Sequence, residues 1–138
     1  MGKISGPLLD RIDLHVEVEP VPFKKLSDTR RAESSASIRR RVTEARKRQK
    51  ERFKNAKNTH YNAQMSSRQI RKYCCLDQEA TQLLKSAMER LSLSARAYDR
   101  ILKVSRTLAD LAGQENVNSD HIAEAIQYRS LDREGWLG

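Results

Sequence analysis

Aromatic side chains are scarce in this sequence of 138 residues: they make up only 5% of it, whereas charged residues make up 33%. A core built on large rings is therefore excluded. The hydrophobic 38% must pack mainly through aliphatic side chains, which favours helices over strands. The length is that of one ordinary domain and is too short for two independent cores. We therefore expect a single, mainly α-helical core.

Glycine and cysteine are also rare, and their positions exclude several kinds of site. The five glycines stand at positions 2, 6, 113, 135 and 138, so no G-x-x-x-x-G-K-[ST] phosphate loop can be formed. Cys74 and Cys75 are adjacent, which disfavours a mutual disulfide, and no second pair completes a zinc site. The three histidines lie in different segments without the spacing of metal ligands. We predict reduced thiols and no metal site.

Long apolar runs are missing as well. No run approaches the roughly 20 residues of a membrane-spanning helix, and the N-terminus lacks the apolar region of a signal peptide. We therefore expect a soluble, cytoplasmic protein without a membrane partner. The predicted state of the thiols agrees with this location, because the cytosol keeps thiols reduced.

Positive charge, by contrast, is present in excess and is concentrated in one segment. The formal net charge is +9, and residues 30–57 hold 12 Lys or Arg against three Asp or Glu, which accounts for all of the excess. Such clustering is typical of a surface that meets phosphates or an acidic protein. The solvated face of an exposed helix has the same composition, so both interpretations stay open at this point.

Residues 12–18 alternate between apolar and polar side chains with a period of two, which predicts a strand. No other segment alternates in this way, so the strand has no partner within the sequence, and its backbone groups need a sheet from elsewhere. Pro20 and Pro22 end the strand and open a linker over 21–29. We expect residues 1–29 to be a flexible remnant of a larger domain.

A long basic helix is predicted over 31–53. Its narrow inner stripe consists of residues at steps of three and four, namely Ile38, Val42, Ala45, Gln49 and Phe53. The remaining faces are rich in Lys and Arg, so we expect only the stripe to pack inward. The cations expected to meet nucleic acid are Arg39, Arg40, Arg46, Lys47 and Arg48.

Four shorter helices are predicted to follow, each starting at a residue whose side chain can accept a backbone hydrogen bond. These caps are Ser66 or Ser67, Asp77, Ser94 and Ser119. Gly113 is expected to end the third of these helices in a left-handed conformation.

Apolar residues at helical spacing give the second and third of these helices wide inner faces, over 80–91 and 98–112. The fourth is expected to bury Ile122, Ala123 and Ile126. Short connections favour a compact antiparallel bundle, on which the basic helix leans. We expect the tail over 131–138 to be frayed.

Two arginines stand at positions where a guanidinium can meet an anion. Arg11 precedes the predicted strand, and Arg96 lies in the first turn of the helix that Ser94 is predicted to cap. The N-terminus of a helix has unsatisfied N–H groups and a partial positive charge, which suits a phosphate. Arginines at such places are also common as plain surface residues, so position alone does not decide between the two roles.

Three motifs of this sequence occur together in one family. They are SGPLLDRIDLHVEV at 5–18, LSARAYDRILKVSRTLADLAG at 93–113 and HIAEAIQYR at 121–129. With these motifs in this order, nearly the whole chain resembles the C-terminal part of the magnesium-chelatase-like AAA+ ATPases, in particular the competence-associated group. Members of that family carry the phosphate loop and the metal-binding acidic motif upstream, and they end in a helical lid.

The resemblance implies a fold and roles for two residues. Residues 1–29 resemble the end of an AAA+ core, with a finger loop, a strand and a linker, and residues 30–138 resemble the helical lid domain. Arg11 matches the arginine of the family's L-L-D-R motif, which resembles the arginine finger that reaches a neighbouring subunit's nucleotide. Arg96 matches the sensor-2 arginine of the lid. Both would neutralise charge on the γ-phosphate.

The resemblance also implies cofactors and partners. The complete protein would use ATP and Mg²⁺ and would assemble with copies of itself into a homo-oligomeric ring, with a hexamer as the expected form and DNA as a candidate partner. This chain lacks the nucleotide-binding core, so we expect it to bind no cofactor alone and to be inactive in isolation.

Three functions are compatible with these features. The first is the lid and interaction module of an ATP-driven, helicase-like ring that remodels DNA. The second is a free-standing basic helical module that binds nucleic acid, and salt-dependent DNA binding by the isolated chain would favour it. The third, a metal-insertion subunit for a tetrapyrrole, follows from the family name, although no residue pattern suggests a porphyrin or magnesium site. The order of the motifs and the unpaired strand favour the first.

Overall fold

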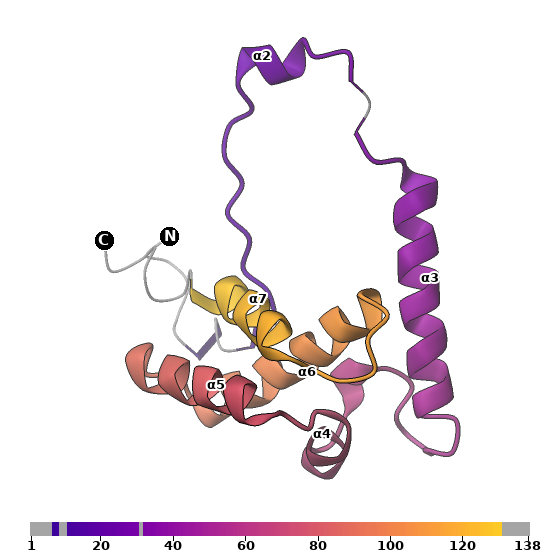
Figure 1. The fold of residues 1–138 in the computed structure, drawn as a ribbon, viewed down its shortest axis with the longest axis vertical. Coiled ribbons are helices and arrows are strands. Elements are labelled where there is room, and N and C mark those ends of the chain that lie inside the picture. The colour runs from indigo at the N-terminus through magenta and orange to yellow at the C-terminus, as the bar shows by residue number, and fades with distance from the viewer. Residues whose placement is uncertain (1–6, 9–10, 31, 131–138) are drawn as a thin grey trace.

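The structure is a computed structural model that describes residues 7–8, 11–30 and 32–130. Within these ranges the chain is mainly α-helical and contains no strand (Figure 1). The elements are α2 (Phe23–Leu26), α3 (Ser35–Arg52), the 3-10 helix η1 (Asn62–Gln64), α4 (Ser67–Tyr73), α5 (Gln78–Arg90), α6 (Ala95–Leu111) and α7 (Ser119–Ser130). The predicted, mainly α-helical fold class is confirmed. The tail over 131–138, which we expected to be frayed, lies outside the described residues.

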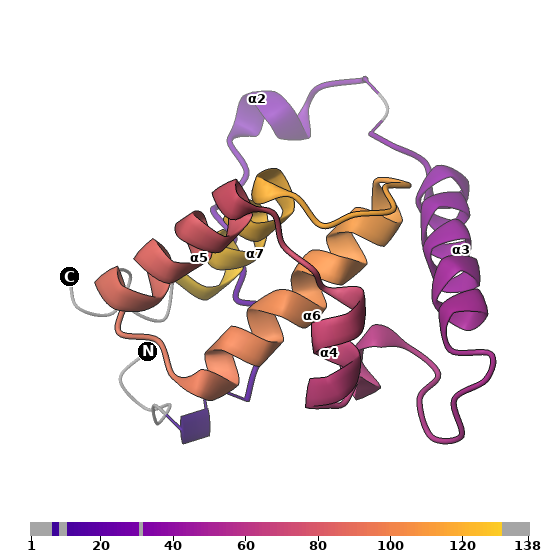
Figure 2. The same cartoon turned by 60° about the horizontal axis from the view of Figure 1, so that its bottom comes forward.

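The core lies between α5, α6 and α7, and α6 runs in the direction opposite to the other two helices (Figure 2). Apolar residues at helical spacing turn one face of each helix inward. Among those that are almost completely buried are Ala80, Leu84, Ile101, Leu102, Ala109, Ile122 and Ala125. The inner face predicted for α5 is confirmed. That of α6 is confirmed in its middle, whereas Tyr98 and Ala112 at its two ends are exposed. On α7 the prediction was partly wrong, because Ala125 is buried whereas Ala123 is exposed.

Side-chain caps fix where the helices begin. Three caps are as predicted, since each side chain accepts the backbone N–H three residues further on: Ser66, Asp77 and Ser94. At α7 the predicted cap, Ser119, was wrong by one residue, because Oδ1 of Asn118 accepts the N–H groups of Asp120 at 2.9 Å and His121 at 3.2 Å. Gly113 has a φ of 70°, the left-handed conformation predicted after α6.

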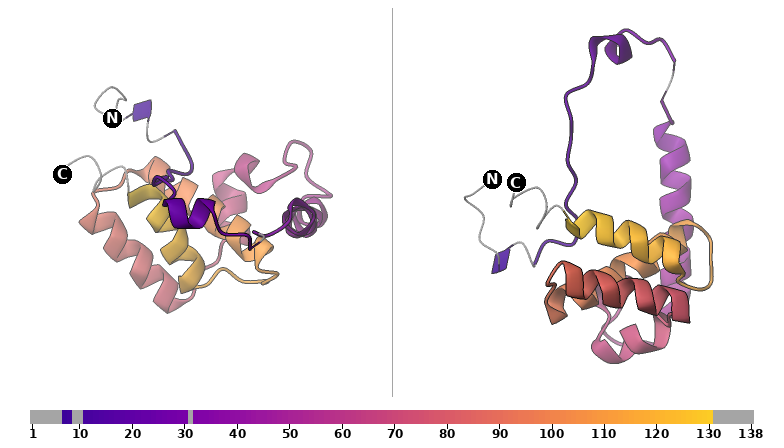
Figure 3. Two further views of the ribbon diagram at one scale, coloured as in Figure 1. Left: turned by 90° about the horizontal axis from the view of Figure 1, so that it is seen from above. Right: turned by 60° about the vertical axis from the view of Figure 1, so that its left-hand side comes forward.

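The basic helix α3 contacts the bundle only through its C-terminal half, and the rest projects away from it (Figure 3). It begins at Ser35, later than predicted, because the side chain of Ser34 accepts a backbone hydrogen bond and caps it there. Ala45 and Gln49 are buried, whereas Ile38 is 43% exposed and Val42 is 42% exposed. The expectation that the whole stripe packs inward was therefore wrong. No described element covers the projecting half.

Residues 12–18 do not form the predicted strand. They are extended but belong to no sheet, because none of the described residues forms a second strand to pair with them. One backbone hydrogen bond joins them to α7, from the N–H of His15 to the carbonyl of Tyr128 at 2.8 Å. The linker that follows contains the short helix α2, which begins after Pro22 and leaves Phe23 81% exposed.

Candidate nucleic-acid interface and nucleotide-contacting arginines

A buried cluster of charged and amide groups fixes the base of α3 to α6. The carboxylate of Asp110 on α6 is completely buried and accepts two hydrogen bonds from the Arg52 guanidinium, at 2.9 and 2.6 Å. Nδ2 of Asn62 donates to the same carboxylate at 2.9 Å, and Nη2 of Arg106 lies 3.2 Å from it. A buried carboxylate is tolerated only when it is paired and hydrogen-bonded. The cluster therefore determines where α3 leaves the bundle.

Arg106 connects further segments to this cluster. Its guanidinium donates to three carbonyl oxygens, those of Tyr73, Gln114 and Glu115. Burial lowers the pKa of Arg106, and the neighbouring carboxylate of Asp110 opposes the shift. The sequence analysis missed this cluster. Its one local signal is that Arg106 and Asp110 stand four residues apart on an otherwise apolar face of α6.

One row of side chains on α3, called here the basic row, carries three cations and the neutral Thr43 but no acidic residue. Arg39, Arg46 and Lys50 are seven and four residues apart and therefore lie on one side of the helix, where all three are exposed. Lys50 was not among the cations predicted to contact nucleic acid, although its spacing of four residues from Arg46 places it on the same side of the helix. The row extends over about 16 Å of helix, a length that suits contacts with successive phosphates of a nucleic acid.

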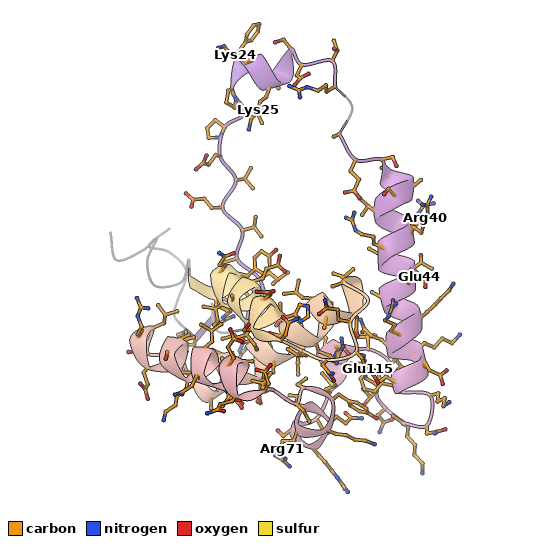
Figure 4. All side chains as sticks on the ribbon, viewed as in Figure 1. Lys24, Lys25, Arg40, Glu44, Arg71 and Glu115 are labelled. Carbon is orange, nitrogen blue, oxygen red and sulfur yellow. The ribbon has the colours of Figure 1, made fainter. Side chains whose placement is uncertain are left out.

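The other predicted cations of α3 have different surroundings. Arg40 lies on the same side of the helix as Glu44 (Figure 4). Lys47 lies on that side too, and its Nζ is 3.1 Å from the Glu44 carboxylate. Arg48 is exposed, but its guanidinium lies beside the end of α6, where a Cβ at Gly113 would come within 3.3 Å of Nη2. The structure therefore places these three cations outside the basic row.

Arg96 lies in the first turn of α6, immediately after the cap. The Ser94 hydroxyl accepts the N–H of Ala97 at 3.2 Å, which holds the start of the helix, and Arg96 is exposed there. The free N–H groups of a helix start and the partial charge of the helix both favour an anion. An exposed guanidinium at this place can therefore donate to phosphate oxygens without rearrangement of the core.

Arg11 follows a turn in which its N–H donates to the carbonyl of Leu8 at 3.1 Å, and its side chain is exposed. Two residues later, Asp13 forms an ion pair with Arg100 of α6. Arg100 and Arg96 are four residues apart and thus lie on the same side of that helix. The structure therefore brings the segment that carries Arg11 to the end of α6 that carries Arg96.

The described residues contain no group of three or more His, Cys, Asp or Glu side chains that could hold a metal ion. Cys74 and Cys75 form no disulfide with any described residue. Cys74 is buried, and burial raises the pKa of its thiol to about 11, whereas Cys75 is exposed. No helix in the described part of the chain is long and apolar enough to cross a membrane.

The fold and the site define a class: a small helical domain that presents an arginine at the start of its central helix and carries a basic helix on its flank. Over residues 32–129 the chain matches the family described as magnesium chelatase, subunit ChlI, C-terminal, and it belongs to that family. The resemblance drawn from the three sequence motifs is thereby confirmed.

Similar proteins come from several bacteria. The chain is 42% identical to the competence protein ComM of Haemophilus influenzae over 134 residues. Over the same length it is 39% identical to the uncharacterized protein YifB of Salmonella typhimurium and 40% identical to that of Escherichia coli. Each comparison covers 96% of this chain but only 25% or 26% of the relative. The chain thus spans about a quarter of the length of the curated relatives it matches.

Proposed function

We propose that this chain is the lid of an ATP-hydrolysing, ring-forming protein that remodels DNA. In this function Arg96 and Arg11 contact nucleotide phosphates, Arg11 reaching the nucleotide of a neighbouring subunit, and the basic row of α3 contacts DNA. The observation that carries the proposal is the ion pair between Asp13 and Arg100, because it holds the segment of Arg11 beside the turn of α6 that carries Arg96.

ATP and Mg²⁺ are the cofactors that this function requires. Within this chain the exposed guanidiniums of Arg11 and Arg96 fit phosphate oxygens, since both are free of the core and arginine donates to such oxygens in a bidentate manner. The chain has no phosphate loop, so the nucleotide base and the metal ion must be held by another part of the protein.

Steady-state ATP hydrolysis by the complete protein tests the proposal. We expect Arg11→Ala to lower kcat by about 10³-fold or more, as the loss of an arginine finger does, and Arg96→Ala to lower it markedly as well. Both side chains are exposed, so the fold should be retained. Arg68→Ala, a change at an exposed arginine of α4, is the matched control. If both test variants hydrolyse ATP as fast as the parent, Arg11 and Arg96 are surface residues without a role in hydrolysis.

A second function is favoured by one observation, the basic row on α3, which needs no nucleotide to bind nucleic acid. In that case the chain is a free-standing nucleic-acid-binding module. The two functions differ in one measurement. A free-standing module binds DNA equally well with and without ATP, whereas the complete protein with a lid changes its affinity for DNA with the nucleotide state.

A further inference from the structure

The segment that follows Arg11 is held at three nearby points by the ends of two helices. The carbonyl of Ile12 accepts a hydrogen bond from Nη1 of Arg129 on α7, and the carboxylate of Asp13 pairs with Arg100 on α6. The third point is the backbone hydrogen bond from His15 to α7. All three lie within four residues of Arg11, so they attach the backbone that follows Arg11 to the bundle.

Arg129 is the most deeply buried of these partners. It lies near the C-terminal end of α7, and only 1% of it is exposed, although a guanidinium is costly to remove from water. A buried guanidinium is tolerated where its N–H groups donate hydrogen bonds. One of these groups in Arg129 donates to the Ile12 carbonyl, next to Arg11. This contact is therefore part of the folded bundle.

Arg100 acts from the surface. Its side chain is 27% exposed and that of Asp13 is 50% exposed, so water screens the pair. The pair joins residues 87 positions apart in the chain, and on α6 it lies one turn beyond Arg96. The ion pair therefore connects the segment next to Arg11 directly to α6, the helix that carries Arg96.

We propose that Arg129 and Arg100 are positioning residues, which fix the backbone after Arg11 to the lid so that Arg11 moves together with the helix that carries Arg96. The inference rests on the proposed function, in which Arg96 contacts nucleotide phosphates and Arg11 reaches the nucleotide of a neighbouring subunit. A fixed spacing between Arg11 and Arg96 means that each guanidinium is in position before the reaction starts. Such preorganisation stabilises the transition state.

ATP hydrolysis by the complete protein tests the role of Arg100. Arg100→Gln and Asp13→Asn should each lower kcat by about 10- to 100-fold with little change in KM. The reason is that a displaced Arg11 would stabilise the transition state less while hardly affecting the binding of ATP. The exchanged pair Asp13→Arg with Arg100→Asp should recover most of the turnover. In the Arg11→Ala background, Arg100→Gln should cause no further loss, because Arg100 acts through Arg11.

The matched control is Arg68→Gln on α4, which should retain the parent turnover. The proposal is overturned if Arg100→Gln is harmless while Arg11→Ala is not, or if its loss is equally large in the Arg11→Ala background. If instead Arg11→Ala and Arg96→Ala both retain parent turnover, it is the proposed function that fails.

Amide hydrogen exchange of the complete protein tests the attachment itself, independently of activity. Arg129→Lys keeps the charge but changes the contact with the Ile12 carbonyl, and we expect the His15 amide to exchange at least tenfold faster in this variant. The amide of Ile101 in the core of α6 should keep its protection, which shows that the bundle stays folded. Unchanged exchange at His15 would overturn the role of Arg129.

Discussion

At the scale of single residues, the orientation of α3 depends on one carboxylate. Asp110 is the only acid in contact with Arg52 and Arg106 among the ion pairs of the described residues, and it receives hydrogen bonds from both α3 and η1. Both arginines are largely buried, so neither can turn to water when the acid is removed. The cluster is therefore a point where a small chemical change should have a large effect on stability.

We predict that Asp110→Asn lowers the free energy of unfolding by about 3–5 kcal/mol, because it leaves two buried guanidiniums without a counter-charge. Urea unfolding followed by circular dichroism measures the change. Glu89→Gln, which removes an exposed carboxylate from α5, is the control and should stay within about 0.5 kcal/mol of the parent. Equal stability of the two variants would show that the cluster does not hold the fold together.

His121 makes the stability of α7 sensitive to acid. Its Nδ1 accepts the backbone N–H of Asn118 at 3.1 Å, which requires the unprotonated nitrogen. Burial and the charge of Arg106 lower the pKa of His121, and the carboxylates of Asp120 and Glu124 oppose the shift. The unfolded state consequently binds the proton more tightly than the folded state, so stability is lost as the pH falls below the ordinary histidine pKa of about 6.5.

We predict that the free energy of unfolding falls between about pH 7 and pH 5, and that His121→Gln removes part of this dependence. Urea titrations at several pH values measure the slope. If the slope of His121→Gln matches that of the parent, the histidine is not the group that titrates.

At the scale of the elements, the sequence predicted the helices well and their surroundings less well. The caps and the apolar spacing of α5 and α6 are local features, so they can be read from a few residues. Ile38 and Val42 continue the stripe of α3 with the correct spacing, but spacing identifies a face and not what covers it. The strand predicted over residues 12–18 was wrong for a related reason. An alternating pattern indicates one extended segment, but a sheet needs a second strand that pairs with it.

The basic row of α3 gives a prediction at this scale. Arg39→Glu with Arg46→Glu should remove most DNA binding by the chain at low salt. The slope of log affinity against log salt should become shallower by about one for each phosphate that the variant no longer neutralises. Fluorescence anisotropy with a labelled duplex measures both the affinity and the slope, and circular dichroism checks the helix.

The control is Lys47→Glu on α3 with Lys54→Glu in the turn that follows it. It changes the net charge equally but removes cations that already pair with Glu44 and Glu51. It should weaken binding less. An equal loss in the two variants would mean that binding depends on total charge alone, and an absence of binding by the parent would leave α3 as a solvated face or a contact with another subunit.

At the scale of the whole molecule, the chain should be inert toward ATP by itself. It contains no phosphate loop, and its proposed phosphate contacts are two exposed arginines. We predict no phosphate release above background when the purified chain is incubated with ATP and Mg²⁺. Turnover that persists through repeated purification and scales with the concentration of the chain would contradict this.

The candidate site could be predicted only in part. Arg96 was recognisable because its cap and its helix are adjacent in the chain, and Arg39 and Arg46 because they fall in one basic segment. Asp13 and Arg100 are 87 residues apart in the sequence, and Arg52 and Asp110 are 58 residues apart. No local sequence pattern can therefore predict either ion pair. These long-range contacts decide how the site is assembled, and they follow from the packing of the complete bundle.

The attachment of α3 to one end of α6 has a mechanical consequence. α6 carries Arg96 in its first turn and Asp110 near its last, and α3 stands on that far end as an arm of 18 residues, about 27 Å long. An arm clamped at its base magnifies rotation, so a tilt of α6 by about 10° would carry the tip through about 5 Å. That displacement exceeds the spacing of about 3.4 Å between successive bases of a DNA strand. A small tilt of α6 is thus geometrically sufficient to shift Arg39, about 20 Å from the base of α3, by about one base step, whereas Lys50 near the base would hardly move. The buried Asp110 cluster is the joint that would transmit the tilt.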